Sequence, residues 1–480
     1  MRRFNSLTEV RHELTAGTTT CRQLVEYYLD NIQQKNARLN AFLEVWPEEA
    51  RAQAEAVDAK LAAGTAGKLA GMVIGLKDVL AYKGHALQSS SHILDGFKSL
   101  FTASAVQRLL DEDAILIGRQ NCDEFAMGAS NETSYFGPAR NEIDPDRVPG
   151  GSSGGSAVAV QADMCLASIG SDTGGSVRQP AAFCGIIGFK PTYSRISRYG
   201  LVAYASSFDQ IGTLTRSVED AALLLEVMAG ADSFDSTASQ REVPAYSQQL
   251  EPAPHYRIGY IKDCLERPGL NAEIKEATEN ALEQFRAQGH VVEAVDFPYL
   301  DFIVPTYYIL TTAEASSNLS RFDGVKYGYR APDATDLESL YKKTRAQGFG
   351  PEVQRRILLG TFVLSASYYD AYYTKAQRVR RLIKDTTDEL LRQYDFLVLP
   401  TTPTTAFRIG DVNKDTLAMY LADIFTVQAS LAGVPAVSVP NGEDSAGLPI
   451  GLQILSGAFR EEQLLAFAKS VTETVTPTVS

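Results

Sequence analysis

The chain carries two glycine-flanked serine runs, Pro149-Gly150-Gly151-Ser152-Ser153-Gly154-Gly155-Ser156 and, further on, Gly170-Ser171-Asp172-Thr173-Gly174-Gly175-Ser176. Glycines at this density cost backbone entropy, so they mark places where the backbone takes φ > 0 or approaches another group closely. A serine that ends such a run can expose its hydroxyl beside several backbone N–H groups. Acyl transfer requires this combination of a nucleophile and a preformed oxyanion hole.

A serine hydroxyl is a weak nucleophile unless a base accepts its proton. None of the chain's five histidines lies in a glycine-rich or otherwise site-like context, so a Ser-His-Asp triad has little support; they are His12, His85, His92, His255 and His290. Lys77 is the better candidate because it closes an apolar, strand-like run over residues 71–79, and lysine is rarely buried without a purpose. The alternative is an ordinary lysine at a strand end, paired with Asp78.

The amino-acid composition argues against several classes of function. A net charge of -13 over 480 residues argues against a protein whose main task is to grip a phosphate backbone. The five cysteines are scattered without a C-x-x-C pair, and we interpret them as reduced packing residues of a cytosolic protein. The sequence shows no phosphate-binding loop, no metal-ligand spacing, no signal peptide and no membrane span, so we expect no metal or nucleotide on this chain.

Helical and strand patterns alternate along the chain, which predicts an α/β fold: a single large α/β/α sandwich with a central mixed sheet covered by helices. Strands are expected near 71–79, 114–118, 257–260, 291–295, 396–400, 436–440 and 451–455. Residues 217–220 have the spacing of a capping box that opens a helix ending before Gly230. We expect one domain over 1–480, with a helical N-terminal segment of about 1–65 and surface excursions at about 231–254 and 329–352.

The two serine runs, continued by Val177-Arg178-Gln179-Pro180-Ala181 and by residues 183–192, resemble the amidase signature family over essentially the whole chain. The resemblance implies a Ser–cis-Ser–Lys triad in which Ser176 is the nucleophile, Ser152 the bridging serine after a cis peptide, and Lys77 the base. It further implies an oxyanion hole built from the backbone of Thr173, Gly174 and Gly175.

Several other segments resemble one branch of that family, the glutaminase subunits of tRNA-dependent amidotransferases; they are 123–128, 136–141, 314–324, 352–362, 369–373 and 421–425. Glutamine needs a guanidinium for its α-carboxylate and a carboxylate for its α-ammonium. The resemblance assigns these roles to Arg356 and Asp423, with Tyr307 nearby and with Met127 and Gly128 as further substrate-binding residues. Arg355 and Tyr308 remain open as alternatives to Arg356 and Tyr307.

The resemblance implies a cytoplasmic heterotrimer in which this chain hydrolyses glutamine and supplies ammonia for converting Glu-tRNA(Gln) to Gln-tRNA(Gln). A B subunit would bind tRNA, ATP and magnesium, and a small C subunit would complete the assembly. Whether Asp-tRNA(Asn) is also amidated is left open, because that choice rests with the tRNA-binding partner. Two other functions stay in view: a free-standing amidase of a small non-polar or aryl amide, and a catalytically silent scaffold.

Overall fold

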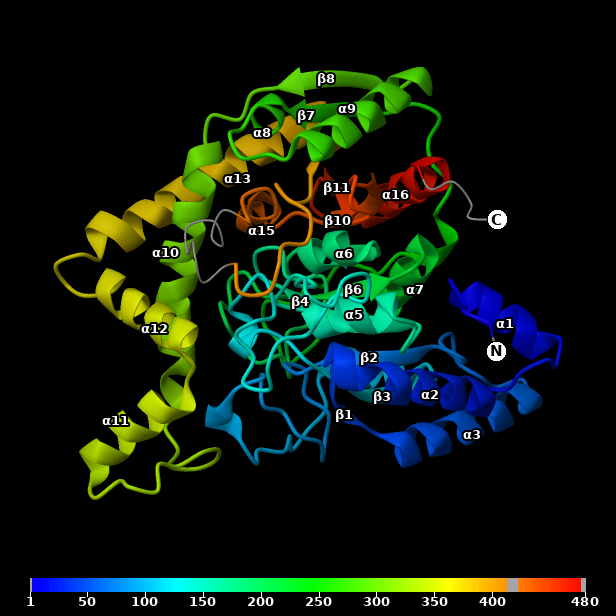
Figure 1. The fold of residues 1–480 in the computed structure, drawn as a ribbon. Coiled ribbons are helices and arrows are strands. Elements are labelled where there is room, and N and C mark those ends of the chain that lie inside the picture. The colour runs from blue at the N-terminus through cyan, green and yellow to red at the C-terminus, as the bar shows by residue number, and fades with distance from the viewer. Residues whose placement is uncertain (1, 412–421, 476–480) are drawn as a thin grey trace.

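The computed structural model describes residues 2–411 and 422–475 (Figure 1). One mixed sheet runs through them, and its eleven strands lie in the order β1 (Phe42–Val45), β3 (Ile115–Gln120), β2 (Val73–Lys77), β4 (Ala167–Asp172), β6 (Gln210–Thr215), β5 (Ile187–Lys190), β10 (Ala436–Glu443), β11 (Pro449–Ser456), β9 (Phe396–Pro400), β7 (Arg257–Ile261) and β8 (Val291–Val295). All the strands expected from sequence are present, and the predicted α/β/α class with a mixed sheet is confirmed.

The sheet contains two parallel groups of strands joined by an antiparallel middle, and the edge strand β1 is antiparallel to β3. Strand β2 runs parallel to both β3 and β4, and β7 runs parallel to both β8 and β9, whereas the pairs that link them through β6, β5, β10 and β11 are antiparallel. Every residue of β2 and β4 is buried, which is typical of parallel strands covered on both faces.

Helices cover the sheet on both faces. They are α1 (Leu7–Thr15), α2 (Cys21–Leu39), α3 (Pro47–Ala63), α4 (Ser104–Asp111), α5 (Gly154–Gln161), α6 (Arg178–Cys184), α7 (Val218–Met228), α8 (Lys262–Leu265), α9 (Ala272–Ala287), α10 (Leu300–Asn318), α11 (Leu337–Gly348), α12 (Pro351–Val363), α13 (Lys375–Gln393), α15 (Val427–Ala432) and α16 (Glu461–Val475). Helices α5 and α6 contact each other over the middle strands, and α7 contacts α16. Helix α10 leaves the sheet, and α11, α12 and one end of α13 project with it to one side (Figure 1).

The start of α7 corrects one local prediction. Ser217 Oγ accepts the N–H of Asp220, as a capping residue does, but the reciprocal bond from the Ser217 N–H to the Asp220 carboxylate is not formed. Instead its two oxygens accept the N–H of Leu7 at 3.0 and 3.1 Å. The expected capping box is therefore half formed, and its acidic member holds the first helix of the chain against α7.

The segments singled out in the sequence contain the following elements. Residues 1–65 hold α1, α2, β1 and α3. Residues 231–254 hold one short 3-10 turn, Tyr246–Gln248, whose tyrosine is buried. Residues 329–352 hold α11 and the first turn of α12.

Two large apolar clusters fill the interior. One joins α1–α7 and α16 to most of the sheet, and the other joins α10, α12, α13 and α15 to β7, β9 and β11. All five cysteines are buried free thiols, as predicted. Among the described residues, no helix combines the length and the apolar character that crossing a bilayer would require.

Candidate active site

Lys77 ends strand β2, and its side chain is completely buried. The Nζ atom lies 2.7 Å from Ser152 Oγ, 2.9 Å from Ser153 Oγ and 2.9 Å from Ser171 Oγ. Burial lowers the pKa of this ammonium to about 8, against the opposing effect of nearby acidic groups. An appreciable fraction of the lysine is thus neutral near neutral pH, as a base must be.

Asp78, the next residue, does not pair with Lys77. Its Oδ2 lies 2.8 Å from Arg119 Nη1, and its carboxylate also accepts the backbone N–H groups of Gln88 and Ser90. The alternative of an ordinary lysine paired with its neighbour is therefore wrong.

The two serine runs lie against each other. The Gly151–Ser152 peptide bond is cis, as predicted. The Ser153 N–H donates to Ser176 O at 3.1 Å, and the Gly151 N–H donates to Gln179 Oε1 at 2.8 Å. Ser176 keeps 7% of its surface exposed. No hydrogen bond among the described residues joins the Ser152 and Ser176 hydroxyls. Of the two hydrogen bonds that the proton path needs, the one between Lys77 and Ser152 is therefore formed and the one between Ser152 and Ser176 is not.

Thr173, Gly174 and Gly175 form the turn that leads from β4 to Ser176. Gly175 takes φ +136°, and its N–H donates to Asp172 Oδ1 at 2.9 Å. The N–H groups of Thr173, Gly174 and Ser176 donate to none of the described residues. These three N–H groups are available to an oxyanion, whereas that of Gly175 is engaged.

The buried ion pair between Asp172 and Arg178 holds this turn in place. Arg178 Nη2 lies 2.8 Å from Asp172 Oδ1, and Arg178 Nε lies 3.0 Å from Oδ2. Although burial acts to raise it, Arg178 holds the pKa of Asp172 below its usual value. Arg178 Nη1 also donates to the carbonyl oxygen of Thr426 at 2.7 Å, so the pair connects the turn to the segment before α15.

Tyr307 projects from α10 onto the same turn. A Cβ added to Gly174 would lie 2.5 Å from Tyr307 Oη, which only a displaced phenol could tolerate. The close approach of the two explains why a glycine is needed there.

Arg356 and its neighbour Arg355 both pair with Glu352 on α12 but differ in burial. Arg356 is buried, whereas the Arg355 side chain is 55% exposed. Arg356 Nε lies 2.8 Å from Glu352 Oε1, and Nη1 donates to Tyr204 Oη at 2.9 Å. These contacts engage Nε and Nη1, and they identify Arg356 as the arginine that faces the interior.

Asp423 is buried in the segment before α15, and Tyr308 Oη donates to its Oδ2 at 3.2 Å. Burial raises the pKa of Asp423 to about 7, although Arg356 and Tyr308 act to lower it. Thr426 Oγ1 donates to Gly174 O at 2.6 Å and so ties this segment to the turn before Ser176. Leu421, which begins the corresponding motif, lies outside the described residues.

Met127 and Gly128 are adjacent in the chain but pack against different partners. Met127 is buried in the apolar cluster that also contains Tyr307. At Gly128, an added Cβ would lie 2.3 Å from Asp123 Cγ, so the glycine packs directly on that carboxylate.

Several residues of this arrangement escaped the sequence analysis. Glu352 could have been found, because it precedes Arg356 by one helical turn and the two can pair on α12. Tyr204, Thr426 and Asp209 carry no local signal; the last accepts a hydrogen bond from Thr173 Oγ1 at 2.7 Å. Their roles depend on contacts between distant parts of the chain.

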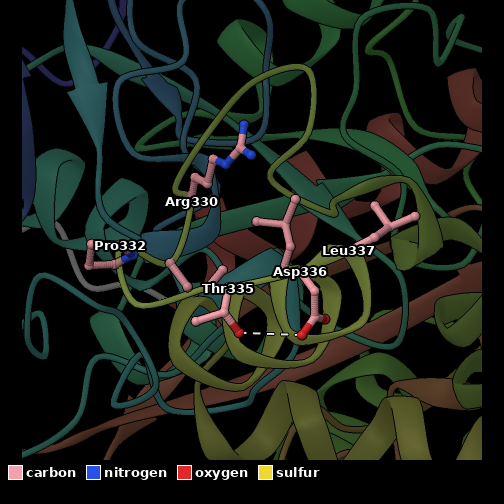
Figure 2. Close-up of a pocket in the computed structure, with 8 residues that line it drawn as sticks. Arg330, Pro332, Thr335, Asp336 and Leu337 are labelled. Atoms are coloured by element: carbon pink, nitrogen blue, oxygen red, sulfur yellow. Dashed lines mark hydrogen bonds between the residues drawn. The ribbon is translucent and has the colours of Figure 1, made fainter.

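A separate surface hollow of about 450 Å³ lies on the α11 side of the molecule (Figure 2). Its lining comes from a single stretch, residues 330–340, and includes none of the predicted site residues. The described residues also contain no cluster of three or more His, Cys, Asp or Glu side chains that could hold a metal ion.

Curated relatives match the chain along nearly all of its length. The glutamyl-tRNA(Gln) amidotransferase A subunit of Chlorobium luteolum is 50% identical over 97% of this chain and 96% of its own. The protein of the same name from Nostoc sp. is 48% identical over 96% of each chain.

Solved structures share the fold. The glutamyl-tRNA(Gln) amidotransferase A subunit of Thermotoga maritima has a TM-score of 0.79 at 38% identity and covers 95% of this chain and 92% of its own. The peptide amidase of Stenotrophomonas maltophilia has a TM-score of 0.82 at 29% identity, over 97% and 96%. The amidase family model matches residues 23–465, and this chain therefore belongs to the amidase family.

Proposed function

We propose that this chain is the glutamine-hydrolysing subunit of a tRNA-dependent amidotransferase. One observation carries the proposal. The buried Lys77 contacts Ser152 at 2.7 Å beside the turn that bears Ser176, in a chain that is 50% identical to the A subunit of a glutamyl-tRNA(Gln) amidotransferase. The triad gives the reaction class, and the relatives' name gives the use to which the ammonia is put.

The reaction proceeds in two halves. Neutral Lys77 accepts a proton through the Ser152 hydroxyl as Ser176 Oγ attacks the side-chain amide carbon of glutamine. The N–H groups of Thr173, Gly174 and Ser176 stabilise the oxyanion. The C–N bond then breaks, the lysine proton passes to the leaving nitrogen, and ammonia departs. Water attacks the resulting ester by the same proton path and releases glutamate from Ser176.

Substrate selection rests on Arg356 and Asp423. The Arg356 guanidinium donates to the α-carboxylate, and the Asp423 carboxylate accepts from the α-ammonium. The segment carrying Asp423 and helix α10 both reach the Gly174 turn, through Thr426 and Tyr307. The groups that would hold glutamine are thus attached to the turn that would cleave it.

The remaining parts of the reaction belong to partners. A B subunit binds tRNA, ATP and magnesium and activates the misacylated ester, and a C subunit completes the heterotrimer in the cytoplasm. This chain needs no cofactor of its own for the hydrolysis, and its net charge of -13 suits a subunit that does not itself grip tRNA.

Ammonia release from glutamine by the complex reconstituted with the other subunits tests the proposal. Ser176→Ala should abolish it. Ser156→Ala is the matched control, because this buried hydroxyl, which ends the other glycine-serine run, has no hydrogen-bond partner among the described residues. Undiminished release by Ser176→Ala would exclude the proposed nucleophile. Turnover of aryl amides by the isolated chain, with none of glutamine, would favour a free-standing amidase.

A further inference from the structure

Helix α12 is apolar on two opposite faces. Its inner face buries Val353 and Val363 beside Arg356. Its outer face exposes Leu358, Leu359 and Phe362, at 70, 41 and 42%. Residues 355, 358, 359 and 362 follow helical spacing and form one stripe. A helix that is apolar on both faces is normally covered on both, and here one of them is bare.

Aromatic rings extend this stripe beyond the end of α12. The Phe362 ring centroid lies 4.4 Å from that of Tyr368 and 5.8 Å from that of Tyr372, which belongs to the π-helical turn Asp370–Thr374. Tyr368, Tyr369 and Tyr372 are each exposed to about the same degree as Phe362. We refer to Leu358, Leu359, Phe362, Tyr368 and Tyr372 as the outer α12 surface. It lies on the projecting helices at the edge of the molecule (Figure 1).

Two unpaired basic residues follow the aromatic end of this surface. Of the basic residues between 355 and 384, Arg355 and Arg356 pair with Glu352, Arg381 with Asp385 and Lys384 with Asp388, and Arg380 donates to Ser207. Lys375 and Arg378 form no ion pair with any described residue. These two cations follow Tyr372, at the aromatic end of the surface, within six residues, and a partner with carboxylates at that end would be attracted.

We propose that the outer α12 surface is the docking site for an acidic amphipathic helix of another subunit of the amidotransferase. The proposal rests on the proposed function. A ridge of leucine and phenylalanine at helical spacing fits the apolar face of a second helix, and the two cations at the aromatic end fit carboxylates on that helix. Exposed aliphatic side chains of this size offer nothing to a phosphate backbone, which favours protein over nucleic acid.

The position of this surface gives docking a consequence for catalysis. The helix that would receive the partner carries Arg356 on its inner face, within three residues of Leu358 and Leu359. A partner that restrains α12 would hold the guanidinium in place before glutamine arrives. The KM for glutamine should therefore be lower in the complex than in the isolated chain.

The test compares the wild-type chain with a Leu358→Glu/Phe362→Glu variant and a Lys375→Glu/Arg378→Glu variant, each titrated with the purified partner subunits. Both variants should bind at least about 30-fold more weakly, and the wild-type affinity should fall with added salt. Leu337→Glu/Phe302→Glu is the control, because these residues are exposed on α11 and α10. Unchanged melting and labelling of Ser176 by an acyl-phosphonate show that each variant is folded.

The other outcomes are equally informative. Partner binding that neither variant weakens overturns the docking site, and glutamine hydrolysis by that same complex leaves the proposed function standing. A wild-type chain that binds no partner subunit and releases no ammonia overturns both. Self-association in sedimentation, lost in the apolar variant while partner binding persists, identifies a second copy as the occupant. Binding of tRNA that is lost in the same way identifies nucleic acid, and either result overturns the proposal.

Discussion

At the scale of single residues, the site is defined by titratable side chains that are buried away from water. Lys77, Asp423 and Asp209 are all buried, and burial shifts each pKa toward the neutral form, to about 8 for the lysine and about 7 for both carboxyls. The site is thus able to move and hold protons near neutral pH without a histidine.

Protonation of Lys77 should lower the rate of ammonia release at acidic pH. Lys77 is the base only when neutral, and its pKa is about 8, so kcat for ammonia release should rise with pH through that value. The measurement is kcat between about pH 6 and 9, with glutamine saturating at each pH. Lys77→Met should lower kcat by about 10³-fold or more, with an unchanged melting temperature as the folding control. A pH-independent kcat would contradict the assignment of the base.

Arg356 and Arg355 provide a matched pair for substrate recognition. Arg356→Gln removes the buried guanidinium and should raise the KM for glutamine by about 10–100-fold, the effect of losing a hydrogen bond to a charged group. Arg355→Gln removes an exposed group and should change KM by about twofold or less. Steady-state kinetics on the complex decide between them. A larger effect for Arg355→Gln would place the carboxylate site on the other face of α12.

At the scale of elements, the turn between β4 and α6 depends on what packs against it. Gly174→Ala would place a Cβ 2.5 Å from Tyr307 Oη, displace α10 or the turn, and misalign the oxyanion donors. We expect kcat to fall by about 10²–10³-fold, as when one oxyanion donor is lost. Gly457→Ala is the control, since its Cβ would meet only the flexible Arg460 side chain, at 3.3 Å. Equal activity of the two variants would show that the turn tolerates a side chain.

The Asp172–Arg178 pair should make a large contribution to the stability of the same turn. Arg178→Met leaves a fully buried carboxylate without its guanidinium, and breaking such a pair destabilises a protein by about 3–5 kcal/mol. Lys342→Met removes one partner of an exposed pair on α11 and should cost about 0.5 kcal/mol or less. Urea unfolding of both variants gives the comparison, and similar midpoints would contradict the structural role of the buried pair.

Strands were easier to predict than the helices that complete the glutamine site. Each predicted strand is a short apolar run bounded by glycine or polar residues, so local pattern was sufficient. Helix α10 gave no such signal, because Pro305 lies inside it and argues against a helix. Helix α11 is largely polar and falls in a stretch that we expected to be a surface excursion.

The same limit applies to the site residues. Lys77, Ser152 and Ser176 each lie in a short motif, so the sequence alone could point to them. Arg356 and Asp423 entered through the family resemblance. Tyr204 could not be predicted at all, because its hydroxyl reaches Arg356 across 152 residues of chain.

At the scale of the whole molecule, the predicted glutamine site joins the two apolar clusters. The Gly174 turn belongs to the part built around the central strands, and Arg356 and Tyr307 belong to the helices on the other side. A ligand bound there should therefore stabilise the protein as a unit. With Ser176→Ala preventing turnover, glutamine at about 100 times its Kd adds roughly 2.7 kcal/mol.

We expect this to appear as a rise of roughly 3 °C in Tm by calorimetry. Adding Arg356→Gln to the Ser176→Ala background should remove the shift at the same glutamine concentration. An equal shift in both variants would mean that glutamine binds elsewhere.

The five buried thiols make the protein well suited to site-directed spectroscopy. Burial raises the pKa of each, to about 12 for Cys122 and about 11 for Cys165, so the folded chain presents little thiolate to an alkylating dye. A single cysteine introduced at an exposed position such as Leu337 would then be the one fast-reacting thiol. A fluorophore or spin label placed there would report distances within an assembled complex without first replacing any native cysteine.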